Sequence, residues 1–162
     1  MACVLVLGIG NPLLADGGAG IRAALQLAER ARGRTDVTIL DAGTLSFPLL
    51  PALGSADALI AIDATRDGGR PGELRVREGE EFDRFIRRSG RSVNETSLAD
   101  LFERARLSGQ LPARRVLIGV EPGTVDWGLE LSPPVAAALT RCVDLALEFI
   151  ERWHPPTGDR VH

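Results

Sequence analysis

The sequence predicts an α/β fold: a three-layer α/β/α sandwich around a mainly parallel, five-stranded sheet. Three observations lead to this prediction. Strand-like and helix-like segments alternate along all 162 residues, which is the pattern of βαβ units. One strand-like segment, residues 58–62, is apolar throughout, as expected where both faces of a parallel sheet are covered. Three successive strands end in a glycine or an aspartate, at the edge where open α/β folds keep their binding sites.

The first half of the chain supplies three of the strands. Residues 3–7 are apolar and form the first strand, which runs into a glycine-rich loop and then a helix ending near Gly33. The apolar face of that helix is predicted to hold Ile21, Leu25, Ala28 and Ala31. Residues 37–40 and 58–62 form the next two strands, and a short helix containing Pro48 and Pro51 joins them.

The second half supplies the remaining strands and two helices. Residues 73–77 alternate as in an exposed edge strand, and residues 78–95 are the most polar part of the chain. Thr96 or Ser97 caps a helix whose buried face is predicted to hold Leu98, Leu101, Phe102 and Ala105. After a buried strand at residues 116–120, Ser132 caps a long final helix. Its apolar stripe holds Val135, Leu139, Val143, Ala146 and Ile150.

The composition excludes several classes of chemistry. All 19 basic residues are arginine, so neither a Schiff base nor a P-loop lysine is available. The histidines, His154 and His162, lie in a proline-rich tail, which argues against an interior Ser-His-Asp or Cys-His site. A net charge of -3 with mixed signs argues against nucleic acid or an anionic membrane as the main partner.

The chain is expected to form one domain over residues 1–153, followed by a tail at residues 154–162. Cys3 and Cys142 lack the close spacing of metal ligands, and we interpret both as small buried hydrophobic residues; a disulfide between them is possible but nothing in the sequence supports it. Glycines and polar residues interrupt the apolar opening, and no segment has the length of a membrane span. We therefore expect a cytoplasmic protein.

Three aspartates mark the candidate site. Asp16, Asp41 and Asp63 follow the first three strands and should lie near one rim of the sheet. Each of them, taken singly, is also explained as a turn or helix-capping residue. The opening glycines permit a second hypothesis, a small nucleotide-binding domain. However, Leu13 stands where the dinucleotide-binding motif has its third glycine, and the loop is too long for that motif.

Several longer motifs occur in a specific order. They are Gly8-Ile9-Gly10-Asn11-Pro12-Leu13-Leu14-Ala15-Asp16 with Gly18-Ala19-Gly20-Ile21-Arg22, then Asp41-Ala42-Gly43-Thr44, Ile62-Asp63-Ala64, Ser108-Gly109-Gln110-Leu111-Pro112, and residues 116–122. In these motifs the chain resembles the maturation endopeptidases that trim the C-terminus of nickel-iron hydrogenase large subunits. The resemblance implies a phosphorylase/hydrolase-like α/β/α sandwich and a large-subunit precursor already loaded with nickel as the partner.

The resemblance also implies three nickel-examining positions, of which one is kept here. Asp63 matches the aspartate after the third strand, but Gly17 replaces an acid and Asn94 replaces a histidine. Glycine has no side-chain donor, and a neutral amide is a poorer nickel ligand than imidazole. Asp16, Asp41 and Glu95 are the candidate replacements.

Two interpretations of this departure follow. In the first, the protein cleaves the precursor with an altered site, where water polarised at or near the nickel attacks the peptide and Asp16, beside Asp63, acts as general base. In the second, the protein keeps the fold and the hydrogenase partner as a non-catalytic binding scaffold. We favour the loss of ordinary nickel-dependent cleavage.

Overall fold

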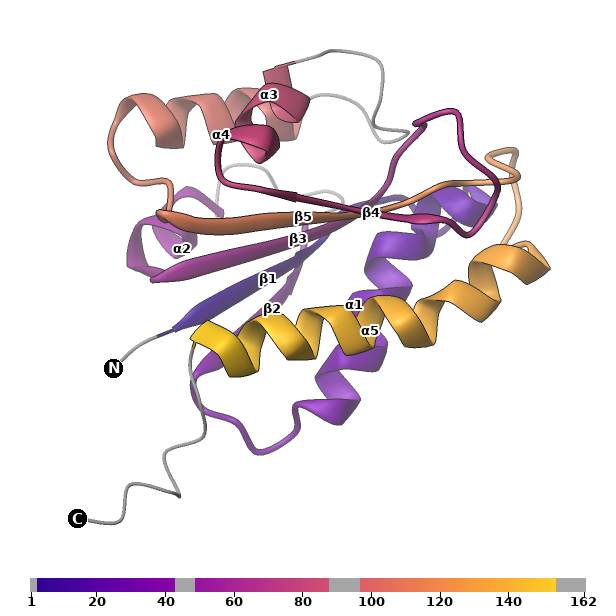
Figure 1. Ribbon diagram of the computed structural model, residues 1–162, viewed down its shortest axis with the longest axis horizontal. Helices are drawn as coiled ribbons and strands as arrows, with labels where there is room; N and C mark the ends of the chain where they lie inside the picture. The colour runs from indigo at the N-terminus through magenta and orange to yellow at the C-terminus, as the bar shows by residue number, and fades with distance from the viewer. Residues whose placement is uncertain (1–2, 43–48, 88–96, 154–162) are drawn as a thin grey trace.

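The computed structural model describes residues 3–42, 49–87 and 97–153, and it contains a sheet with the strand order β2-β1-β3-β5-β4 (Figure 1). The strands are β1 (Val4–Gly8), β2 (Val37–Asp41), β3 (Ala58–Ala64), β4 (Leu74–Glu78) and β5 (Arg114–Val120). Four strands are parallel, and β4 runs antiparallel to β5 at one edge. The predicted mainly parallel, five-stranded sheet is therefore confirmed, together with its edge strand.

Helices cover both faces of this sheet, which confirms the three-layer sandwich (Figure 1). The short 3-10 helix η1 (Ala15–Gly18) leads into α1 (Ala19–Arg30), and α1 lies beside α5 (Pro133–Trp153) on one face. The other face carries α2 (Leu49–Ser55), α3 (Glu80–Arg87) and α4 (Ser97–Leu107). We call these the α1/α5 face and the α2–α4 face.

The buried face of α1 differs from the predicted one. Ile21 and Ala31 are buried as expected, but Leu25 is 64% exposed and Ala28 is also exposed. The α1 residues in the core against the sheet are Ala19, Ala23 and Leu27, and none of them belongs to the predicted face. The reason is the close approach of the helix to the strand ends. A Cβ atom at Gly20 would lie 2.1 Å from the carbonyl oxygen of Ile62 and 2.3 Å from that of Ile9.

Part of the polar segment at residues 78–95 forms the helix α3, whose buried aromatic residues were not predicted from the sequence. In α3, Phe82 and Phe85 are buried although most of their neighbours are charged. Phe82 makes an edge-on contact with Phe102 of α4, with 5.4 Å between the ring centroids. Phe82 and Phe85, spaced three residues apart on one side of α3, thus anchor this short helix in the core of the α2–α4 face. The predicted burial of Phe102 and Ala105 is confirmed, whereas Thr96 and the side chains of Leu98 and Leu101 lie outside the described residues.

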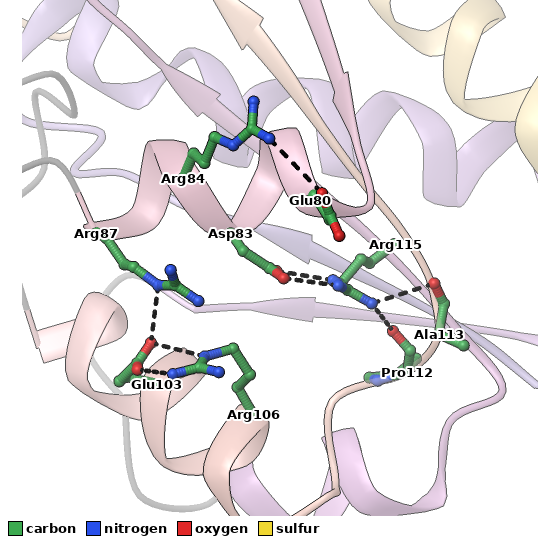
Figure 2. A network of polar contacts seen from close by, with 9 residues as sticks. All are labelled: Glu80, Asp83, Arg84, Arg87, Glu103, Arg106, Pro112, Ala113 and Arg115. Carbon is green, nitrogen blue, oxygen red and sulfur yellow. Dashed lines mark hydrogen bonds and ion pairs between the residues drawn. The ribbon is translucent and has the colours of Figure 1, made fainter.

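Polar contacts fasten α3 and α4 to the sheet and to each other (Figure 2). The guanidinium group of Arg115, at the start of β5, donates to both carboxylate oxygens of Asp83 at 2.8 and 2.7 Å. It also donates to the carbonyl oxygens of Pro112 and Ala113 at 3.1 and 3.2 Å (Figure 2). Because this paired arginine and aspartate are mostly buried, the contact fixes the position of α3 on the sheet.

The long helix α5 has the predicted stripe, and all five of its members are buried. Cys142 joins them in the core, where burial raises the pKa of its thiol to about 12. Cys3, also predicted to be buried, is only half-buried at the amino end of β1, and both cysteines are free thiols. Among the described helices, none is both long and apolar enough to cross a membrane.

Candidate functional site

The candidate site lies at the carboxyl ends of β1, β2 and β3, where the loop from Ile9 to Leu14 leads into η1 and α1. Backbone hydrogen bonds close this loop on itself: Asn11 N–H donates to the Gly17 carbonyl at 3.1 Å, and Leu14 N–H donates to the Asn11 carbonyl at 3.0 Å. Ala15 has a φ of 47°, a left-handed conformation that is uncommon for a residue with a side chain. The residue after this turn, Asp16, directs its carboxylate to the segment between β5 and α5.

Asp16 fastens the first loop to the segment that precedes α5. Its carboxylate is completely buried and accepts four hydrogen bonds. The donors are the N–H groups of Gly123 and Thr124 at 2.8 Å and the N–H and hydroxyl groups of Ser132 at 2.7 Å. The predicted cap residue Ser132 thus directs its hydroxyl to Asp16. The first loop and residues 121–132 form one unit through this carboxylate.

The hydrogen bonds of Asp16 also determine its charge state. Burial opposes ionisation, but the hydrogen bonds from Thr124, Ser132 and Gly123 outweigh burial and hold the pKa of Asp16 below its ordinary value. A carboxylate with a lowered pKa and four donors is a weak proton acceptor. The geometry therefore favours a positioning role for Asp16 in the first loop.

Asp63 and Asp41 both lie at the predicted edge but in different surroundings. Asp63 is buried in β3, next to Gly119 of β5, and Asp41 is exposed at the end of β2. Side chains alternate along a strand. Leu59 and Ala61 belong to the α2–α4 core, which places Asp63 on that face, whereas Val37 and Ile39 pack toward α1 and α5, which places Asp41 on the opposite face.

The remaining predicted positions offer few donors to a metal. Gly17 is buried in η1 and has no side chain. Asn94 and Glu95 lie outside the described residues. Within residues 3–42, 49–87 and 97–153, no three His, Cys, Asp or Glu side chains are grouped so that they could hold a metal ion.

A polar cluster on the α2–α4 face was missed by the sequence reading. Thr65 donates its hydroxyl to Asp67 at 3.1 Å, and Arg77 of β4 forms a salt bridge with the same carboxylate. Arg77 also lies over the ring of Phe85, 4.3 Å from its centroid. The buried Glu121 accepts a hydrogen bond from Asp67 N–H at 2.7 Å. Glu121 comes directly after the buried strand β5. An acidic residue at the carboxyl end of a strand was the sequence signal that could have marked it as a candidate site residue.

Comparisons with known proteins agree with this fold. A family model described as hydrogenase maturation protease matches residues 21–149. The hydrogenase expression/formation protein HupD of Bradyrhizobium diazoefficiens is 39% identical over 93% of this chain and 79% of its own length. The hydrogenase 2 maturation protease of Escherichia coli is 32% identical over 89% of this chain and 88% of its own length.

Solved structures of such proteins superpose on the model. The hydrogenase maturating endopeptidase HybD from Escherichia coli has a TM-score of 0.86 at 30% identity, with 94% of both chains covered. The nickel-iron hydrogenase maturation protease HybD from Thermococcus kodakarensis has a TM-score of 0.77 at 31% identity, covering 90% of this chain and 97% of its own. Sequence and fold therefore agree that this chain belongs to the hydrogenase maturation protease family.

Proposed function

We propose that this protein binds the nickel-loaded large-subunit precursor of a nickel-iron hydrogenase at the rim of its first loop, without the family's usual three-ligand examination of the nickel. Family membership supports the partner and its C-terminal extension as the target. Gly17 carries the second part of the proposal, because the position of the family's acid has no side chain here. The nickel in this proposal is part of the substrate.

The neighbouring carboxylates support the same conclusion. Asp16 would have to release four hydrogen bonds to replace the missing acid, and each lost bond to a charged group costs about 1.5–3 kcal/mol. Asp41 lies on the opposite face of the sheet from Asp63 by strand alternation. Asp63, buried in β3, is thus the one carboxylate of the family's set that this chain keeps.

The first experiment measures the mass of the precursor. The purified protein is incubated with a nickel-loaded large-subunit precursor that bears its C-terminal extension, and an active family member treats the same sample as the positive control. We expect the two proteins to co-elute in gel filtration while the precursor mass stays unchanged. Loss of the extension would contradict the proposal and favour the alternative of cleavage with an altered ligand set.

A second experiment restores the family's side chains. Gly17 lies in a 3-10 helix, a backbone conformation open to any L-residue, so Gly17→Glu combined with Asn94→His should fold. We expect this double variant to remove the extension from the nickel-loaded precursor. The matched control, Gly17→Gln with Asn94→Gln, has similar size without the carboxylate and imidazole and should leave the mass unchanged. If the folded double variant fails to cleave, the two substitutions are not what separates this chain from active members.

Other parts of the sequence reading stay predictions. These are the cytoplasmic location, the division into a domain at residues 1–153 and a tail at 154–162, and the expectation that neither nucleic acid nor membrane is a partner. The nucleotide-binding alternative receives no support from the family model or from the relatives named above, which are described as hydrogenase maturation proteins.

A further inference from the structure

Large apolar side chains are exposed beside the candidate site. Trp127 is 79% exposed, Leu129 is 65% exposed, and Leu13 of the first loop is 49% exposed. They are three of the six exposed large hydrophobic residues in the described part of the chain, and they belong to two backbone segments that are hydrogen-bonded to each other. Such a concentration of apolar surface is typical of a protein interaction site.

The backbone holds these side chains in place. Gly128 N–H donates to the Leu13 carbonyl, and Ala15 N–H donates to the Gly128 carbonyl, both at 2.9 Å. Arg22 of α1 donates to the Leu129 carbonyl. The Asp16 carboxylate fastens both ends of the same segment through Gly123, Thr124 and Ser132. Rigid presentation of an aromatic side chain lowers the entropic cost of binding a partner.

The surroundings indicate the chemistry of that partner. Asp126 and Glu130 are exposed on either side of Trp127 and Leu129, and residues 121–132 contain no basic residue. A shallow hollow lined by Arg22, Leu25 and Leu131 lies next to them, on the side of α1 and α5. This surface therefore fits apolar side chains that are bordered by arginine or lysine.

We propose that Leu13, Trp127 and Leu129, which we call the Trp127 surface, dock the hydrogenase large-subunit precursor through such a basic-edged apolar patch. The inference rests on the proposed function and adds the surface that recognises the partner. The argument for this occupant is continuity and charge. The loop with Leu13 leads directly into η1, which carries Asp16 and Gly17, so a precursor that brings its nickel to this rim lies against Trp127. Tryptophan at the centre of an interface commonly contributes a large share of the binding energy.

The test measures the affinity of immobilised protein for the nickel-loaded precursor by biolayer interferometry. We expect Trp127→Ala to weaken binding by at least about tenfold and Leu129→Ala to weaken it less. Leu107→Ala is the matched control, because Leu107 is 74% exposed at the end of α4 on the opposite face of the sheet. Circular dichroism confirms that each variant is folded. Affinities of the Trp127 and Leu107 variants that match the parent's would overturn the inference while the proposed function stands.

Two further outcomes are informative. If the parent does not bind the precursor at all, the proposed function and the inference both fail. If sedimentation shows a dimer of the parent that Trp127→Ala dissociates, the surface is occupied by a second copy and the inference is overturned. Substituting Asp126→Asn and Glu130→Gln together should slow association and reduce its dependence on salt, because rim charges act mainly on the association rate. A salt dependence equal to the parent's would contradict the basic border proposed for the partner.

Discussion

The α1/α5 face of the sheet is covered by two long helices of 12 and 21 residues, whereas the α2–α4 face is covered by three shorter helices of 7, 8 and 11 residues. On the first face, the helices contribute mostly small and aliphatic residues to one continuous core, with Phe149 and Trp153 near the end of α5. On the second face, aromatic residues from α3 and α4 supply much of the packing. The same sheet is thus covered in two different ways.

The polar residues near the site follow this division. The carboxylate of Asp16 joins the starts of α1 and α5, and its partners are mostly backbone N–H groups. On the other face, Asp67 is engaged by the side chains of Thr65 and Arg77, and Asp63 faces the same side. The α1/α5 face thereby fixes the first loop, and the α2–α4 side of the sheet holds the buried carboxylate of Asp63. Three substitutions test this division of roles.

The largest effect is expected at Gly20, where α1 touches the strand ends. Gly20→Ala should lower the free energy of unfolding by more than about 3 kcal/mol, because the new methyl group meets two backbone carbonyl oxygens that cannot move aside. The matched control is Gly54→Ala in α2, whose Cβ would have its nearest neighbour at 3.7 Å. That control should be neutral or stabilising by up to about 1 kcal/mol, since alanine favours helix. Urea denaturation measures the free energy of unfolding of both variants. Equal losses for Gly20→Ala and Gly54→Ala would contradict the closer approach of α1 to the strand ends.

A smaller effect is expected for Asp16→Asn, which removes the charge that four donors share. The loss should be about 2–4 kcal/mol at pH 7. Because the folded pKa of Asp16 is lowered, its contribution is complete above the pKa of the unfolded chain and is lost as the pH falls through the folded value. The parent should therefore lose more stability than the variant when the pH is lowered below about 4.

The control for Asp16 is Asp41→Asn, at an exposed position on the same edge of the sheet. It should change the free energy of unfolding by less than about 0.5 kcal/mol. Chemical denaturation of all three proteins at neutral and acidic pH provides the comparison. If Asp16→Asn has the parent's stability at neutral pH, the carboxylate does not fasten the first loop as the geometry indicates.

The smallest effect is expected at the pair formed by Asp83 and Arg115. Asp83→Asn should cost about 1–2 kcal/mol, because a mostly buried guanidinium group loses its charged partner while keeping two carbonyl acceptors. Glu80→Gln is the control in the same helix: Glu80 and Arg84 are largely exposed and 3.6 Å apart (Figure 2). It should change stability by less than about 0.5 kcal/mol. Thermal unfolding distinguishes them, and indistinguishable midpoints would mean that the pair does not hold α3.

The α5 stripe could be predicted from the sequence, because its bulky residues recur with the helical period. The face of α1 could not, since a close approach at Gly20 selects alanine over leucine and leaves Leu25 outside. The place of Asp63 at the carboxyl end of the sheet could be predicted because it follows an apolar strand, while its role in the site stays a prediction. The role of Asp16 was not found, because its partners are more than 100 residues away and no local pattern connects them.

The burial of Cys142 has a practical consequence. Its thiol lies inside the core and stays protonated at neutral pH, so it is shielded from thiol reagents. Cys3 is the other cysteine of the chain, and it is half-buried. It precedes β1, whereas the first loop follows β1, so the two lie at opposite ends of this strand. The unmodified protein therefore offers a single natural attachment point for a dye or a biosensor tip, which would leave Trp127 and the first loop facing an incoming partner.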